Sequence, residues 1–286
     1  MSTWGISGPR FLLLYLALFA VTVLGVVLAR RRALAPDGGA AVPAHLDPYE
    51  AAELNGGDAL VATTAVSNLL RGGHLANSSR RQPARLVTGT APDPRAHPVE
   101  WAVYQQIAAA PNRGLKQMQA ALEGSSALAA VRERLRQRGL APTPEQRTRC
   151  RAAGLWFLPL LALGVARVVA GSANGRPVGF LVALLVVTVV VAVVLVLRVP
   201  NATGLGRRTL QELRVASPRP VAGASPAELS MGTALFGAGV LWAADTDIAM
   251  MLRVPREQGF SAVFGGDGGG GGGCGGGGCG GGGCGG

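Results

Sequence analysis

The sequence is poor in lysine, in histidine and in charged residues generally. Lys116 is the single lysine among 27 basic residues, and charged side chains make up 15% of the 286 residues. Such a low charged share is typical of chains whose membrane spans dilute their polar residues. The bias towards arginine, together with much Ala, Gly and Val, indicates GC-rich coding rather than selection for phosphate contacts.

The motifs of common catalytic sites are also missing from the sequence. His45, His74 and His97 show no metal-ligand spacing, and neither a phosphate-binding loop with its lysine nor a serine nucleophile elbow is present. Asp245 and Asp247 have no histidine or third carboxylate beside them, so we interpret them as residues at a helix boundary. The sequence predicts no catalytic residues, no cofactor and no enzymatic activity.

What the sequence does contain is long apolar runs, and two of them form a pair around which the chain is organised. Residues 178–197 carry no charge over 20 positions, the length that a helix needs to cross the hydrocarbon core of a bilayer. A helix satisfies its own backbone groups in lipid, so a helix is predicted despite the many valines. The run 152–171 precedes it across a turn at 172–177. Arg167 lies near the end of that run, where its side chain can reach the lipid headgroups, and we interpret it as a tolerated charge.

A third apolar run lies near the N-terminus. Residues 11–29 follow the short polar segment 1–10 and end at Arg30-Arg31-Arg32. A cleaved signal peptide has its basic residues before the apolar core, whereas here they follow it, as at a stop-transfer boundary. The run is therefore predicted to be an anchor. The expected fold class is an all-α membrane protein with three transmembrane helices.

The distribution of arginine predicts the orientation of the chain in the membrane. Segment 33–151 holds 14 Lys and Arg residues, whereas segment 1–10 and the turn 172–177 hold one each. Basic residues accumulate on the cytoplasmic side of membrane helices. We expect a multi-pass protein of the cell membrane with its N-terminus outside, and with residues 33–151 and the C-terminal tail in the cytoplasm. The net charge of +11 has the same explanation, and it also favours contact with the lipid bilayer.

The segment between the first two runs is long enough for a small core. After a linker at 30–47, apolar residues recur at helical spacing through 48–140, which is predicted to be a helical cytosolic module. Gly56-Gly57 and Gly72-Gly73 interrupt the helices. Pro48 suits the first turn of the first helix, and Asp58 suits the cap of the second.

Two short strands are predicted after the second glycine pair, one at Leu75 and one at 85–88. A helix, a Gly-Gly turn, a second helix and a strand pair have the outline of a winged helix. Folds that never touch DNA share that outline, and residues 59–70 offer Thr, Ser and Asn rather than Arg to base edges. A nucleic-acid partner is therefore disfavoured and a cytosolic protein partner is favoured. The arginines between 132 and 138 are interpreted as a solvated surface near the membrane.

The segment after the hairpin, 198–264, is predicted to be cytosolic. It contains one apolar helix near 231–252. The continuous apolar part of that helix, 231–244, is 14 residues long, which is too short to span a membrane.

The C-terminal tail is the most distinctive part of the sequence. Residues 265–286 consist of glycine, Asp267 and three cysteines, Cys274, Cys279 and Cys284, spaced five apart. Polyglycine has no side chain to bury and much backbone entropy to lose, so the tail is predicted to be disordered. One interpretation of the thiols is a metal site, although structural zinc motifs usually place their cysteines two to four apart. Lipidation, oxidant sensing and modification by peptide-tailoring enzymes are others, and drift of GC-rich codons is the alternative without function.

Several short motifs accompany this architecture, namely Glu53-Leu54-Asn55-Gly56-Gly57, Leu69-Leu70-Arg71-Gly72-Gly73-His74-Leu75, and Ala234-Leu235-Phe236-Gly237 leading to Asp245. With the anchor, the hairpin and the tail, the chain resembles a family of uncharacterised actinobacterial membrane proteins that end in glycine runs with cysteines. The resemblance covers nearly the whole chain and implies location and architecture, but no activity, cofactor or catalytic residue. The expected function is a membrane-anchored interaction or scaffold protein. The alternative is a thiol-based sensor or metal-binding protein that acts through the tail.

Overall fold

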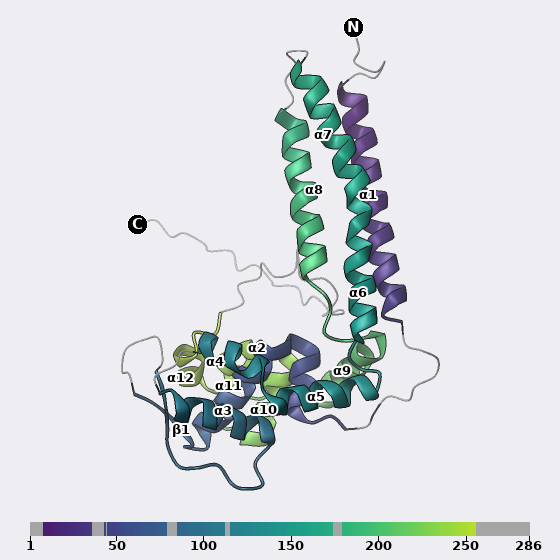
Figure 1. Cartoon of the computed structure of the whole chain (residues 1–286). Helices are drawn as coiled ribbons and strands as arrows, with labels where there is room; N and C mark the ends of the chain where they lie inside the picture. The colour runs from purple at the N-terminus through teal and green to yellow at the C-terminus, as the bar shows by residue number, and fades with distance from the viewer. Residues whose placement is uncertain are drawn as a thin grey trace, which may run out of the picture. The chain divides into compact units, whose positions relative to one another are not determined.

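The computed structural model describes residues 8–35, 43, 45–78, 85–111, 115–173 and 179–255. It divides the chain into one unit of residues 1–254 and another of residues 255–286, and the elements below belong to the first unit. Most of the described chain is helical (Figure 1). The predicted tail 265–286 and most of the predicted turn 172–177 lie outside the described residues.

Three helices are long and apolar enough to cross a membrane (Figure 1). The first is α1 (Gly8–Ala33) and the third is α8 (Gly179–Leu197). The second consists of α6 (Pro144–Ala152), the short 3₁₀ turn η2 (Ala153–Trp156) and α7 (Phe157–Ala173). The three predicted apolar spans are thus confirmed as candidate membrane helices.

The second membrane helix starts before its apolar run, at a polar N-terminus. Thr143 caps α6 by accepting a hydrogen bond from the backbone N–H of Gln146, and the Gln146 side chain accepts one from the backbone N–H of Thr143. Pro144 occupies the first turn, where its missing N–H costs nothing. A polar helix therefore leads directly into the membrane helix.

Small residues let the membrane helices approach closely. A Cβ atom at Gly154 would lie 2.2 Å from the Val196 side chain, and one at Gly164 would lie 3.0 Å from the Tyr15 hydroxyl. Tyr15 and Thr188 are fully buried, and their hydroxyl oxygens are 3.4 Å apart. Packing of small residues and hydrogen bonds between helices are the forces that hold membrane helices together.

Arg167 is more buried within the protein than the sequence suggested. The sequence suggested a side chain that reaches the headgroups, but the residue is only 7% exposed. Its guanidinium lies 4.8 Å from the centroid of the Phe11 ring, within the range of a cation–π interaction. Contact with α1 replaces the expected exposure.

The helical domain is built around α2 (Pro48–Arg71). Asp47 caps this helix in a capping box with Glu50, and the predicted interruption is a kink at Gly57, whose φ of 63° and ψ of −157° are not helical. The helix ends at Gly72-Gly73 as predicted. Around α2 lie two strands and three helices, namely β1 (Leu75–Asn77), β2 (Leu86–Thr88), α3 (Pro98–Ala109), α4 (Leu115–Glu123) and α5 (Ser126–Gln137). The predicted strand pair is confirmed, since β1 and β2 pair antiparallel.

The segment after the hairpin completes the core of this domain. It forms α9 (Gly204–Ala216), α10 (Pro226–Phe236), η3 (Ala238–Val240), α11 (Leu241–Ala244) and α12 (Thr246–Met251). The expected single helix near 231–252 is wrong, because the chain breaks at Gly237, where φ is 87°. α10 packs along α2, and one hydrophobic cluster runs from Leu46 to Val254. The sequence placed these parts in two separate segments, but the structure joins them in one core.

Substitution of Gly57 by alanine tests the kink in α2. Its backbone lies in a region that only glycine adopts readily, and a Cβ there would lie 2.7 Å from the Asn201 side chain. We expect Gly57→Ala to lower the free energy of unfolding by about 1–3 kcal/mol. Gly124→Ala is the control, because a Cβ at Gly124 meets open space. Thermal unfolding of the full chain in detergent compares the two, and equal melting temperatures would contradict the expectation.

Candidate functional site

Two glutamates of α2 are buried and lie next to arginines of α5. Glu50 is 2% exposed and Glu53 is 4% exposed. Arg138 donates to Glu50 Oε2 at 2.9 Å, and Arg132 donates to Glu53 Oε1 at 3.0 Å. Arg132 also donates to Asp58. The arginines between 132 and 138 were predicted to be a solvated surface. Arg132 and Arg138 instead form ion pairs with the buried glutamates of α2.

Asp58 was predicted to cap a second helix, but its carboxylate pairs with Arg132. Burial, followed by the charge of Asp58, raises the pKa of Glu53. Burial lowers the pKa of Arg132, but its hydrogen bonds to Asp58 and Glu53 outweigh that effect, so its pKa is raised. The three groups therefore form an ionic triad, with Glu53 buried and Arg132 and Asp58 half-buried, which joins α5 to α2.

A second polar cluster joins the start of α2 to α3. The rings of Tyr49 and His97 stack with their centroids 4.5 Å apart. The Tyr49 hydroxyl donates to Glu100 Oε1, and Asn68 donates to the same oxygen at 2.7 Å. Burial and then the charge of Glu100 raise the pKa of Tyr49. The phenol therefore stays protonated and acts as a hydrogen-bond donor.

His97 is the N-cap of α3. Its Nδ1 accepts a hydrogen bond from the backbone N–H of Val99 at 3.2 Å, which requires a ring nitrogen without a proton. Burial lowers the pKa of His97, and the carboxylate of Asp47, whose Oδ1 lies 3.9 Å from Nε2, acts in the opposite direction. The folded state therefore favours the neutral imidazole.

This lowered pKa predicts a loss of stability in mild acid. The unfolded chain takes up a proton at His97 near the ordinary value of 6.5, whereas the folded chain takes it up only at lower pH. Its contribution is therefore complete above that value and is lost as the pH falls towards the folded pKa. We expect His97→Asn, which keeps a capping side chain, to reduce the fall in melting temperature between pH 7.5 and pH 5.5. Identical pH profiles for the two proteins would contradict the assignment.

Arg30 joins the arginine-rich ends of the three membrane helices, and we call this set of contacts the Arg30 clamp. The guanidinium donates to the carbonyls of Cys150 at 3.2 Å and Arg198 at 3.3 Å, and to that of Leu195. Leu195 and Arg198 lie at the C-terminal end of α8, where carbonyls lack helical partners and the helix dipole favours a cation. Arg30 is 8% exposed, so these bonds are shielded from water.

Removal of the clamp should destabilise the membrane helices. Arg30→Ala leaves carbonyls at the end of α8 without a donor, and we expect the free energy of unfolding to fall by about 3 kcal/mol. Arg32→Ala is the matched control, since Arg32 is exposed two residues further along α1. Thermal unfolding in detergent measures both variants. A loss as large for Arg32→Ala as for Arg30→Ala would show that charge alone matters.

A further cluster fixes α10 to α2 and involves two of the sequence motifs. The Asn55 amide donates to the carbonyls of Ala234 at 2.9 Å and Leu235 at 3.1 Å. Arg214 of α9 donates to the Leu235 carbonyl at 2.7 Å and to the Asn55 amide oxygen at 2.6 Å. The motifs at 53–57 and 234–237 therefore meet in space, which their separation in the sequence did not indicate.

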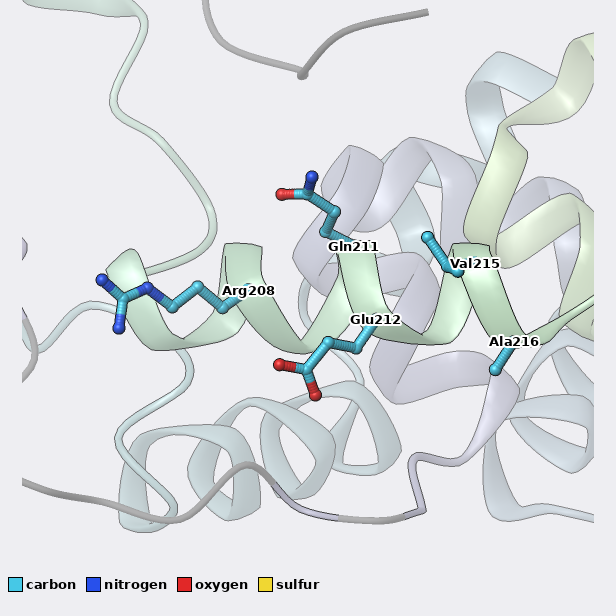
Figure 2. A pocket seen from close by; sticks show the side chains of 5 residues that line it. All are labelled: Arg208, Gln211, Glu212, Val215 and Ala216. Carbon is cyan, nitrogen blue, oxygen red and sulfur yellow. The ribbon is translucent and has the colours of Figure 1, made fainter.

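Two shallow hollows lie on the surface of the described chain. Figure 2 shows the first, lined by Arg208, Gln211, Glu212, Val215 and Ala216. All five residues belong to α9, so this hollow is the outer face of one helix. The second lies between α3, α5 and the preceding loop, and is lined by Pro94, Ala96, Pro98, Trp101, Ala102, Gln105, Ser126 and Ala127. We call this second hollow the Trp101 surface.

The predicted metal ligands Cys274, Cys279 and Cys284 lie outside the described residues, so the metal hypothesis stays a prediction. Within the described part of the chain, no group of three or more His, Cys, Asp or Glu residues is placed to hold a metal ion. Asp245 accepts a hydrogen bond from the Ile248 N–H at 3.1 Å and caps α12, which confirms its interpretation as a boundary residue.

Comparisons with protein families, with characterised proteins and with solved structures found no match to this chain. The resemblance to actinobacterial membrane proteins therefore stays a prediction. Three polar clusters, around Glu53, Tyr49 and Asn55, join the helices of the helical domain to one another. The Arg30 clamp joins the ends of the three candidate membrane helices.

Proposed function

We propose that the protein is a membrane-anchored interaction protein whose helical domain binds a cytosolic protein partner. The observation that carries the proposal is the Trp101 surface. The indole N–H of Trp101 donates to the Asp93 carbonyl at 3.1 Å. The Trp101 ring meets the Tyr104 ring edge-on, with centroids 5.9 Å apart. A half-exposed tryptophan held in one orientation is the kind of residue that dominates protein interfaces.

The orientation in the membrane is part of the proposal. Because residues before and after the hairpin share one core, α7 and α8 must return the chain to the side from which it left. The excess of arginine in segment 33–151 supports the cytoplasm as that side. The N-terminus would then lie outside the cell.

We further propose that the domain does not read DNA, although its outline resembles a winged helix. In that outline, the second half of α2, after Gly57, would be the recognition helix. Thr63, Thr64 and Ser67 are buried there, and their hydroxyls donate to backbone carbonyls within the helix. Base readout needs side chains that reach a groove. Burial of this face within the domain therefore argues against base readout.

The experiment uses the full chain, because a fragment of residues 33–151 would lack α9 to α12 and with them part of the core. A photo-crosslinking amino acid replaces Gln105, which is exposed at the Trp101 surface, in the full chain expressed in cells. The crosslinked adducts are then identified by mass spectrometry. We expect one dominant protein adduct. A crosslinker at Val215, which is exposed on α9, is the control. Adducts at Gln105 that are no more abundant than those at Val215 would contradict the proposal.

Ser126→Glu offers a test that leaves the fold intact. Ser126 is exposed at the first position of α5, where a carboxylate favours the helix, yet it also lines the Trp101 surface. We expect the adduct to fall about tenfold, as for the loss of an interface hot spot of about 1.4 kcal/mol. Gln211→Glu adds a carboxylate at an exposed position of α9 that does not line the Trp101 surface, and it should leave the adduct unchanged.

A further inference from the structure

The arginines at the start of the second membrane helix carry more positive charge than their neighbours balance. Arg147 and Arg151 lie four residues apart and therefore on one face of α6. Arg147 is also within electrostatic range of Arg132 and Arg136 of α5 and of the carboxylate of Glu53. Guanidinium groups repel one another, so an arrangement of this kind needs anions nearby.

Each of the three neighbouring carboxylates already pairs with another arginine. Glu53 and Asp58 pair with Arg132, and Glu133 pairs with Arg136 at 3.5 Å. In the described residues, the Nε–H of Arg147 is buried and has no hydrogen-bond acceptor. A buried donor on a charged group is costly when it is left unpaired. An acceptor from outside the chain would remove that cost.

The position of Arg147 indicates which acceptor is available. α6 continues through η2 into α7, and the apolar run begins at Ala152, directly after Arg151. Arg147 lies four residues earlier, which is about 6 Å along a helix. This is the depth of the polar headgroup region next to the hydrocarbon core. Phosphate is the anion found there, and the planar guanidinium fork matches its oxygens in pairs.

We propose that Arg147, Arg151 and Arg136 form a phosphate-binding site at the polar end of the second membrane helix. The phosphate belongs either to the headgroup of an anionic lipid or to a soluble phosphate compound. Arg132 adds positive potential but does not bind, because two carboxylates, Glu53 and Asp58, occupy its guanidinium, whereas Arg136 has one carboxylate partner, the exposed Glu133, at 3.5 Å. The alternative to a bound phosphate is an ion pair within the protein. Glu53 Oε2 also lacks a hydrogen-bond partner, and a direct pair between Glu53 and Arg147 would satisfy both groups.

The lipid arm of the test uses the full chain in nanodiscs of phosphatidylglycerol and phosphatidylcholine. The protein is transferred to a neutral detergent, and native mass spectrometry counts the phosphatidylglycerol molecules that remain bound. We expect Arg147→Gln and Arg151→Gln to retain about tenfold less than wild type, the effect of losing one charge-assisted hydrogen bond to phosphate. Arg149→Gln removes the same charge from an exposed position on the same helix and should retain as much as wild type.

The phosphate arm adds inorganic phosphate to the protein in neutral detergent and measures the melting temperature. A rise for wild type and for Arg149→Gln, but not for Arg147→Gln, assigns the site to soluble phosphate compounds. Equal lipid loss in all three variants would mean diffuse attraction to the membrane and would overturn the site. No dependence on Arg147 in either arm would favour the pair with Glu53 and would overturn it as well.

Arg147→Lys protects the test against a folding defect. Lysine keeps the charge but lacks Nε and the fork, so a built site predicts reduced phosphatidylglycerol retention at an unchanged melting temperature. If Arg147→Lys retains as much phosphatidylglycerol as wild type, binding depends on charge alone. That result would contradict a site built on guanidinium geometry.

Discussion

The packing of α10 against α2 is the contact on which the rest of the structure depends. It joins chain segments on either side of the membrane hairpin in one hydrophobic core, and Asn55 and Arg214 fix the end of α10 in place. In the topology proposed above, the segments before and after the hairpin lie on one side of the membrane, because both belong to this core.

The Arg30 clamp extends this constraint to the first membrane helix. One guanidinium contacts the ends of the second and third membrane helices, and the Gly204 N–H donates to the Leu34 carbonyl at 2.9 Å, which ties α9 to the end of α1. Thr203, the cap of α9, donates through its hydroxyl to the Gly139 carbonyl at the end of α5. Hydrogen bonds to backbone groups at helix ends thus connect the candidate membrane helices to the helical domain.

Local rules accounted for much of this fold. The length of the apolar runs predicted the three candidate membrane helices, the glycine pairs predicted the interruption and the end of α2, and the short runs at Leu75 and 85–88 predicted the strand pair. Long-range contacts could not be predicted in this way. No periodicity indicates that Asn55 meets Leu235 or that Arg132 meets Glu53, because such pairs depend on how separate helices pack. The available signal was weaker: acidic residues, Glu50 and Glu53, in one helix of the module and four arginines between 132 and 138 in another.

The divided core also sets an order of events during synthesis. Domains generally fold as units, and this one lacks α9 to α12 until residue 254 has been made, after all three membrane helices have left the ribosome. Until then, the apolar face of α2 that contacts α10 lacks its partner. In the topology proposed above, a chain with a misplaced α7 or α8 would not complete its core, and it would keep an apolar surface of the kind that chaperones and proteases recognise.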